Sequence, residues 1–114
     1  MLRIVTTGAF ALCTFAGFTV AKADVIRVAM VVADSQADYD NNAALLDTFS
    51  ALLKKGNAKA VYVGSDPAKM TITTTSVWAS EADVGAVTGS ADWKAAAGKL
   101  KAKTYNSEVF QLVQ

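Results

Sequence analysis

Hydrophobic and polar residues alternate in several segments of the chain, as they do in strands that expose one face. The first segment, residues 25–33 (VIRVAMVVA), is rich in β-branched side chains. Arg27 lies on one face of this predicted strand, and the opposite face carries Ile26, Val28, Met30 and Val32. Three further strands are predicted, and the first two are close enough for an antiparallel hairpin: residues 59–64, 69–79 and 107–113.

Two other segments show the spacing of three to four residues that is typical of amphipathic helices. The first is predicted over residues 41–55, with Asp38, Asp40 or Asn41 as its cap. Gly56 follows as its C-terminal stop. Its apolar stripe consists of Leu45, Leu46, Phe49, Leu52 and Leu53.

The second helical segment has Ser80 as its predicted N-cap and is interrupted at Gly89-Ser90, where Ser90 is predicted as a new N-cap. It restarts at Ala91 and is predicted to run to about Lys103. Its apolar stripe consists of Trp93, Ala96, Ala97 and Leu100.

The resulting order, β-α-β-β-α-β, predicts an α+β fold of the ferredoxin-like type. Such a fold has a four-stranded antiparallel sheet with two helices on one face, and its other face must be solvated or covered. Val25, Ala29 and Val31 alternate with Arg27 and are too apolar for a fully solvated face. We therefore expect a homodimer in which two sheets pack face to face to form a dimeric α/β barrel.

Residues 1–23 have the pattern of a secretory signal peptide rather than of a folded segment. Arg3 precedes an uncharged stretch over residues 4–20, which is marginal in length for a membrane span. Ala21 and Ala23 then occupy the positions that favour cleavage before Asp24. The sequence thus predicts one mature domain over residues 24–114, located in the periplasm or secreted.

Composition narrows the possible chemistry. The 114 residues include no His, which excludes imidazole bases and His-ligated metals. Cleavage would remove Arg3, Lys22 and the only Cys, leaving 9 Lys+Arg against 10 Asp+Glu, a net charge of −1. This balance is unlike that of a nucleic-acid-binding protein. We expect no cofactor, no nucleic-acid partner and no membrane attachment after cleavage.

Two short segments resemble a known superfamily: residues 77–81 (VWASE) and 90–96 (SADWKAA). They are similar to segments of the dimeric α/β-barrel proteins, in particular the antibiotic-biosynthesis-monooxygenase-like group. The resemblance implies a small-molecule site, and in the haem-degrading members a ligating His at the position of Ala97. Cofactor-independent oxygenases of the superfamily surround an aromatic substrate with Trp, Asn, Tyr and Arg, and Trp78 matches the family's Trp at the end of a strand.

The candidate site is a cleft between sheet and helix that could hold a flat apolar ligand. Core packing is the alternative role for the same side chains. Tyr62 and Tyr105 could donate hydrogen bonds into such a pocket. The candidate residues are Trp78, Trp93, Phe49, Met30 and Tyr62.

Two polar features allow a functional and a structural interpretation. Arg27 could bind a carboxylate ligand, or it could pair with Glu108 or have another structural role. Asp38, Asp40 and Asn42 have the spacing that opens a calcium-binding loop, but Ala43 and Phe49 stand where that loop needs Gly and Glu. Helix capping explains the acidic residues better, and a weak calcium site is left open.

The sequence therefore predicts a secreted dimer that binds an apolar or aromatic small molecule. Catalysis as a cofactor-independent monooxygenase is one hypothesis. The alternative is a carrier or interaction protein of the same fold without catalytic activity.

Overall fold

The computed structural model describes residues 24–113, so the predicted signal peptide lies outside the described residues. No helix in the part described is long and apolar enough to cross a membrane. The strands are β1 (Val25–Val32), β2 (Ala60–Asp66), β3 (Thr71–Trp78) and β4 (Thr104–Gln111). The helices are α1 (Gln36–Ala44), α2 (Leu46–Lys55), α3 (Glu81–Thr88) and α4 (Ala91–Ala97), with a short 3₁₀ helix η1 (Pro67–Lys69).

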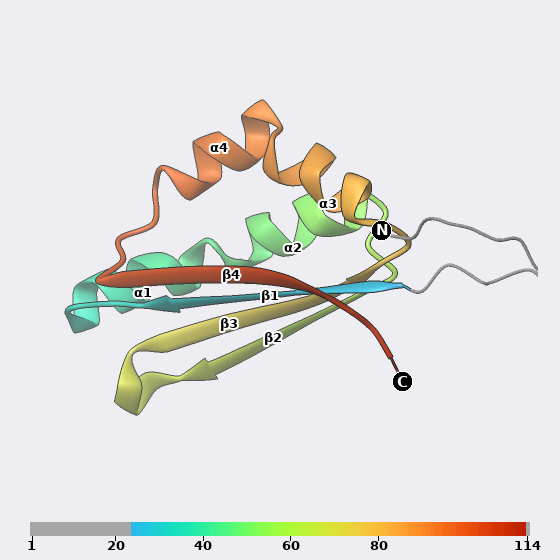
Figure 1. Cartoon of the computed structure of the whole chain (residues 1–114). Helices are drawn as coiled ribbons and strands as arrows, with labels where there is room; N and C mark the ends of the chain where they lie inside the picture. Colours follow the sequence, from blue (N-terminus) through green and yellow to red (C-terminus); the bar gives the residue numbers. More distant parts are fainter. Residues whose placement is uncertain (1–23, 114) are drawn as a thin grey trace, which may run out of the picture.

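The four strands form one antiparallel sheet in the order β2-β3-β1-β4. Within residues 24–113 the four helices lie together on one side of this sheet, and no helix or strand covers its other side (Figure 1). The β2–β3 hairpin and the ferredoxin-like α+β topology predicted from the sequence are confirmed.

Each predicted helix is divided into two shorter ones. The break at Gly89-Ser90 and the N-caps Ser80 and Ser90 were predicted and are confirmed. The start of the first helix is a correction, because the cap is Ser35, whose hydroxyl accepts from the amide of Asp38. Asp38, Asp40 and Asn41 therefore lie inside α1 and do not cap it.

The second correction concerns the end of α4, which stops at Ala97 instead of continuing to about residue 103. Gly98 follows as the C-cap, and the chain then crosses to β4 in an irregular loop, residues 98–103. Because this loop is short, β4 begins at Thr104, three residues before the predicted start.

The orientation of β1 is the third correction. Its helix-covered face carries Val25, Arg27, Ala29 and Val31, whereas Met30 lies on the open face and is 45% exposed. From the sequence, Arg27 was expected on the face that the helices leave open. The small Ala29 allows close packing on this side, and aromatic partners surround the guanidinium. The alternation was therefore correct, and its assignment to the two faces was wrong.

The main core lies between the helices and one end of the sheet. Leu53 and Trp78 are completely buried within it. Its other buried members are Val25, Phe49, Val84, Val87, Trp93 and Ala96. A smaller cluster of Ala33, Tyr39 and Ile72 supports the other end of the sheet. Between these two clusters the packing leaves a cavity.

Candidate functional site

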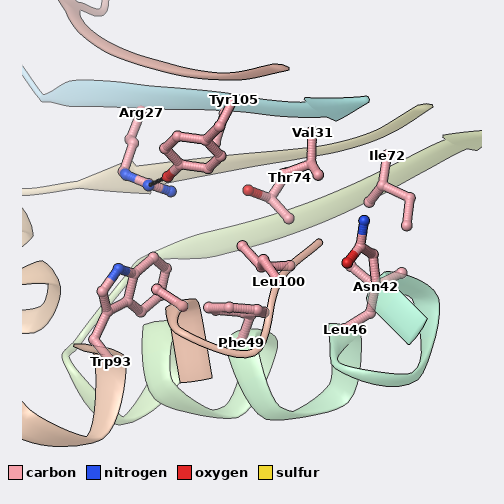
Figure 2. A pocket seen from close by; sticks show the side chains of 12 residues that line it. Arg27, Val31, Asn42, Leu46, Phe49, Ile72, Thr74, Trp93, Leu100 and Tyr105 are labelled. Atoms are coloured by element: carbon pink, nitrogen blue, oxygen red, sulfur yellow. Dashed lines mark hydrogen bonds between the residues drawn. The ribbon is translucent and has the colours of Figure 1, made fainter. Parts of the chain in front are cut away.

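The cavity lies between the helix-covered face of the sheet and helices α2 and α4, as Figure 2 shows. The cavity has a volume of about 40 Å³ and is partly open to solvent. It is thus a narrow slot that already excludes most water. The lining consists of Arg27, Ala29, Val31, Asn42, Leu46, Phe49, Ile72, Thr74, Trp93, Ala97, Leu100 and Tyr105.

One end of the slot is built around Arg27. This side chain is only 4% exposed. Its Nη2 donates to the hydroxyl of Tyr105 on the neighbouring strand β4, at 2.9 Å. Its Cζ atom lies 5.0 Å from the centre of the Trp93 ring, which gives a cation–π contact. Figure 2 shows the guanidinium and the phenol turned toward each other above the indole.

The floor of the slot is aromatic. Phe49 of α2 and Trp93 of α4 meet edge to face, with ring centres 4.9 Å apart and planes at 69°. This geometry is favourable because the positive edge of one ring faces the negative face of the other. Both residues belong to the apolar stripes of their helical segments, which is why they point toward the sheet. Together they form an aromatic surface opposite Arg27, with the two ring planes steeply inclined to each other.

The other end of the slot is closed by Asn42 of α1. The side-chain amide of Asn42 donates to the carbonyl of Lys101 at 3.0 Å, and its oxygen accepts from the amide of Lys101 at 2.9 Å. Asn41 adds a bond to the carbonyl of Lys99. These bonds hold the loop 98–103 against α1, and that loop places Leu100 in the wall of the slot.

The five residues predicted as a site do not share one cleft. Phe49 and Trp93 line the slot, and they are the part of the prediction that the structure brings together. Trp78 lies in the core, where its indole donates to the hydroxyl of Ser76 at 2.8 Å. Met30 and Tyr62 lie on the open face of the sheet, and Tyr62 is 64% exposed. They are on the far side of the sheet from the slot.

The structure adds Arg27, Asn42 and Tyr105 to the site. From the sequence, Arg27 was a possible carboxylate ligand and Tyr105 a possible hydrogen-bond donor, whereas Asn42 was not expected in the site. Arg27 and Tyr105 are 78 residues apart and meet only because β1 and β4 are neighbours. The predicted alternative partner Glu108 is paired with Val28 and so lies on the opposite face from Arg27. The signal that was available was an Arg within an otherwise apolar strand.

The possible calcium loop has no support in the placement of its residues. Asp38 and Asp40 lie on α1, and the side chain of Asn42 is bonded to Lys101. In the described range 24–113, no three His, Cys, Asp or Glu side chains are grouped closely enough to hold a metal.

Solved proteins resemble this chain in fold but not in sequence. No family model matches the chain, and no curated protein matches it significantly. An inferred antibiotic biosynthesis monooxygenase from Caulobacter crescentus CB15 superposes with a TM-score of 0.67 at 15% identity, over 82% of this chain and 92% of that one. SnoaB, a cofactor-independent oxygenase from Streptomyces nogalater, superposes with a TM-score of 0.63 at 12% identity, over 82% of this chain and 96% of that one.

A dimeric ferredoxin-like protein from an uncultured marine organism gives a TM-score of 0.61 at 10% identity, over 81% of this chain and 90% of that one. Identities this low establish the fold alone. The chain thus shares its ferredoxin-like fold with these proteins, which is the fold that the resemblance of residues 77–81 and 90–96 implied.

Proposed function

We propose that the chain is a secreted homodimeric protein that binds an apolar or aromatic small molecule in the slot beneath its sheet. The observation that carries this proposal is the slot itself, a partly open, mostly apolar space with an aromatic floor and one buried cation. A flat ring placed between Phe49, Trp93 and the sheet would bury its faces there. Because the slot is narrow, Leu100 and its loop would have to move outward to admit the ring.

Binding can be tested by Trp fluorescence during titration with indole, 1-naphthol and haem. Trp93 lies in the slot and Trp78 in the core, so a slot ligand should quench part of the emission and saturate at one equivalent per chain. The quenching should disappear in Trp93→Phe, with calorimetry as an independent measure of binding. The absence of saturable binding by any of these compounds would refute the proposal.

Two functions remain for such a binding protein, and oxygen uptake separates them. The similarity in fold to SnoaB favours a cofactor-independent monooxygenase. However, among residues 24–113 the slot is lined by no carboxylate, Lys or Cys, and the chain has no His. A substrate would therefore have to ionise without a side-chain base, and Arg27 would stabilise its anion. Oxygen consumption with a bound ligand supports the enzyme, and binding without consumption supports a carrier.

The homodimer would form through the open face of the sheet. Here β1 presents Met30 and the half-buried Ile26, Val28 and Val32. Tyr62 on β2 and Phe110 on β4, the two edge strands, are exposed on the same face. This apolar surface is what the dimer would bury. Sedimentation should give twice the mature mass, and Met30→Lys should dissociate the dimer. The matched control is Ala95→Lys, at an exposed position on α4. A wild-type monomer at micromolar concentration would contradict the assignment.

Secretion is proposed from the N-terminal sequence pattern. Expression of the whole chain in a Gram-negative host should yield a periplasmic protein whose measured mass corresponds to a chain that starts at Asp24. Recovery of the uncleaved chain from the cytoplasm would exclude this part of the proposal.

A further inference from the structure

The starting observation is a buried cation that the protein itself leaves incompletely bonded. Of the two terminal nitrogens of Arg27, Nη2 donates to Tyr105, whereas Nη1 is buried and has no hydrogen-bond partner among the described residues. A buried donor without a partner is costly, and a buried charge without a counter-charge is more so. The burial of the Arg27 guanidinium therefore calls for a specific explanation.

No carboxylate in the described part of the chain neutralises this cation. Within residues 24–113 the structure contains a single ion pair, between Lys59 and Asp24. The nearest acidic residue on the neighbouring strand, Glu108, belongs to the other face of the sheet. Trp93 stabilises the positive charge through its ring but offers no acceptor for the Nη1 hydrogens. A partner subunit on the open face would lie across the sheet from Arg27.

The polar group at the opposite end of the slot is already occupied. Both the amide and the oxygen of Asn42 are bonded to the backbone of Lys101. Between Asn42 and Arg27 the wall is mainly apolar, with Val31, Phe49 and Leu100 facing the space and the small hydroxyl of Thr74 as a neutral polar group (Figure 2). A matching ligand therefore has an apolar body and one polar group, which lies at the Arg27 end.

We propose that the ligand of this slot is a monocarboxylic acid with a small apolar or aromatic body, and that Arg27 binds its carboxylate. One carboxylate oxygen would accept from Nη1. The other would accept from the hydroxyl of Tyr105, which accepts from Arg27 and keeps its own hydrogen free to donate. A flat carboxylate suits the planar guanidinium. A phosphate carries more charge and more oxygens than one guanidinium and one hydroxyl can satisfy.

This inference rests on the proposed small-molecule function and names its ligand class. Calorimetric titration of the purified full-length mature chain with benzoate and with the neutral isostere benzamide tests it, and 2-naphthoate with 2-naphthamide forms a second pair. We expect each acid to bind at least tenfold more tightly than its amide. Arg27→Met should weaken the acids at least tenfold and change the amides by less than threefold. Tyr105→Phe should weaken the acids about threefold to tenfold.

A stability measurement shows whether the variant is folded and distinguishes a ligand role from a structural one. Because Nη1 is unpaired, Arg27→Met should leave the melting temperature of the ligand-free protein unchanged or raise it. A large drop would assign Arg27 to the core and overturn the inference. Equal binding of acids and amides, or binding of indole while neither acid binds, would also overturn it and leave the small-molecule function standing. If no compound binds at all, both this inference and the proposed small-molecule function fail.

Discussion

The clamp between α1 and the loop 98–103 yields the sharpest stability prediction. Asn42→Ala removes the two bonds with the backbone of Lys101, at 2.9 and 3.0 Å, from a side chain that is 2% exposed. Each such bond contributes about 0.5–1.5 kcal/mol net. Lys101 is exposed, so water can reach the freed backbone groups after the substitution. We therefore expect a loss of about 1–3 kcal/mol in the free energy of unfolding.

The matched control is Asn41→Ala, at the adjacent position of α1. Asn41 makes an exposed bond to the carbonyl of Lys99 and a longer one, 3.2 Å, to the side chain of Asn42. Its loss should be smaller, about 0.5–1 kcal/mol. For a domain of this size, 1 kcal/mol corresponds to about 4–8 °C in melting temperature, so thermal and urea unfolding resolve the two variants.

The clamp also links stability to the slot, because the loop that it holds contributes Leu100 to the wall. Asn42→Ala should increase amide hydrogen exchange in residues 98–103 before it affects β1. Equal losses for the two Asn variants, or unchanged exchange in the loop, would refute the role of Asn42 as the element that fixes this wall.

Further predictions concern packing and caps. Gly56→Ala should destabilise the protein by about 1–3 kcal/mol, because the new methyl would lie within 1.9 Å of the Val87 side chain. Gly85→Ala, on α3 in open space, should instead stabilise it by about 0.5–1 kcal/mol, and the reverse order in urea unfolding would contradict the packing. Leu53→Ala, at a fully buried position, should cost about 2–5 kcal/mol in the same assay. Ser80→Ala should cost about 1 kcal/mol, and Ser80→Gly clearly less, if the hydroxyl caps α3 as its bond to an amide indicates.

The order of elements was predictable because local signals agree with the fold. The β-branched alternation in β1 and the Gly89-Ser90 break each act over a few residues. The start of α1 was missed because residues 36–42 are mostly polar, with Tyr39 as the one large side chain that the core buries. Asn42 is buried only through its bonds to a loop 59 residues away, and no local pattern encodes that contact. The α4 segment ends earlier than its apolar spacing predicted, at the C-cap Gly98, and the loop that follows is the one that Asn42 binds.

The aromatic half of the site was predictable for the same reason, and the polar half was not. Phe49 and Trp93 follow helical spacing, and a helix on a sheet points its apolar stripe at the sheet. The side of the sheet on which Met30 and Arg27 lie depends instead on which face of β1 the helices cover. Both faces of that strand are apolar apart from Arg27, so hydrophobicity alone favours the arrangement that exposes the charge.

The structure has the opposite arrangement, and this is informative about function. Covering Arg27 requires the helices to accept a buried guanidinium, and the protein supplies a ring and a hydroxyl but no counter-charge among its described residues. To expose Arg27, the helices would only have had to cover the opposite face of β1, which is already apolar. A polar residue that breaks the pattern of its strand at a net cost in stability is expected at a functional site. The faces of β1 were assigned wrongly because Arg27 is buried at an energetic cost. This cost supports a functional role for the Arg27 end of the slot, which is also where the unpaired Nη1 lies.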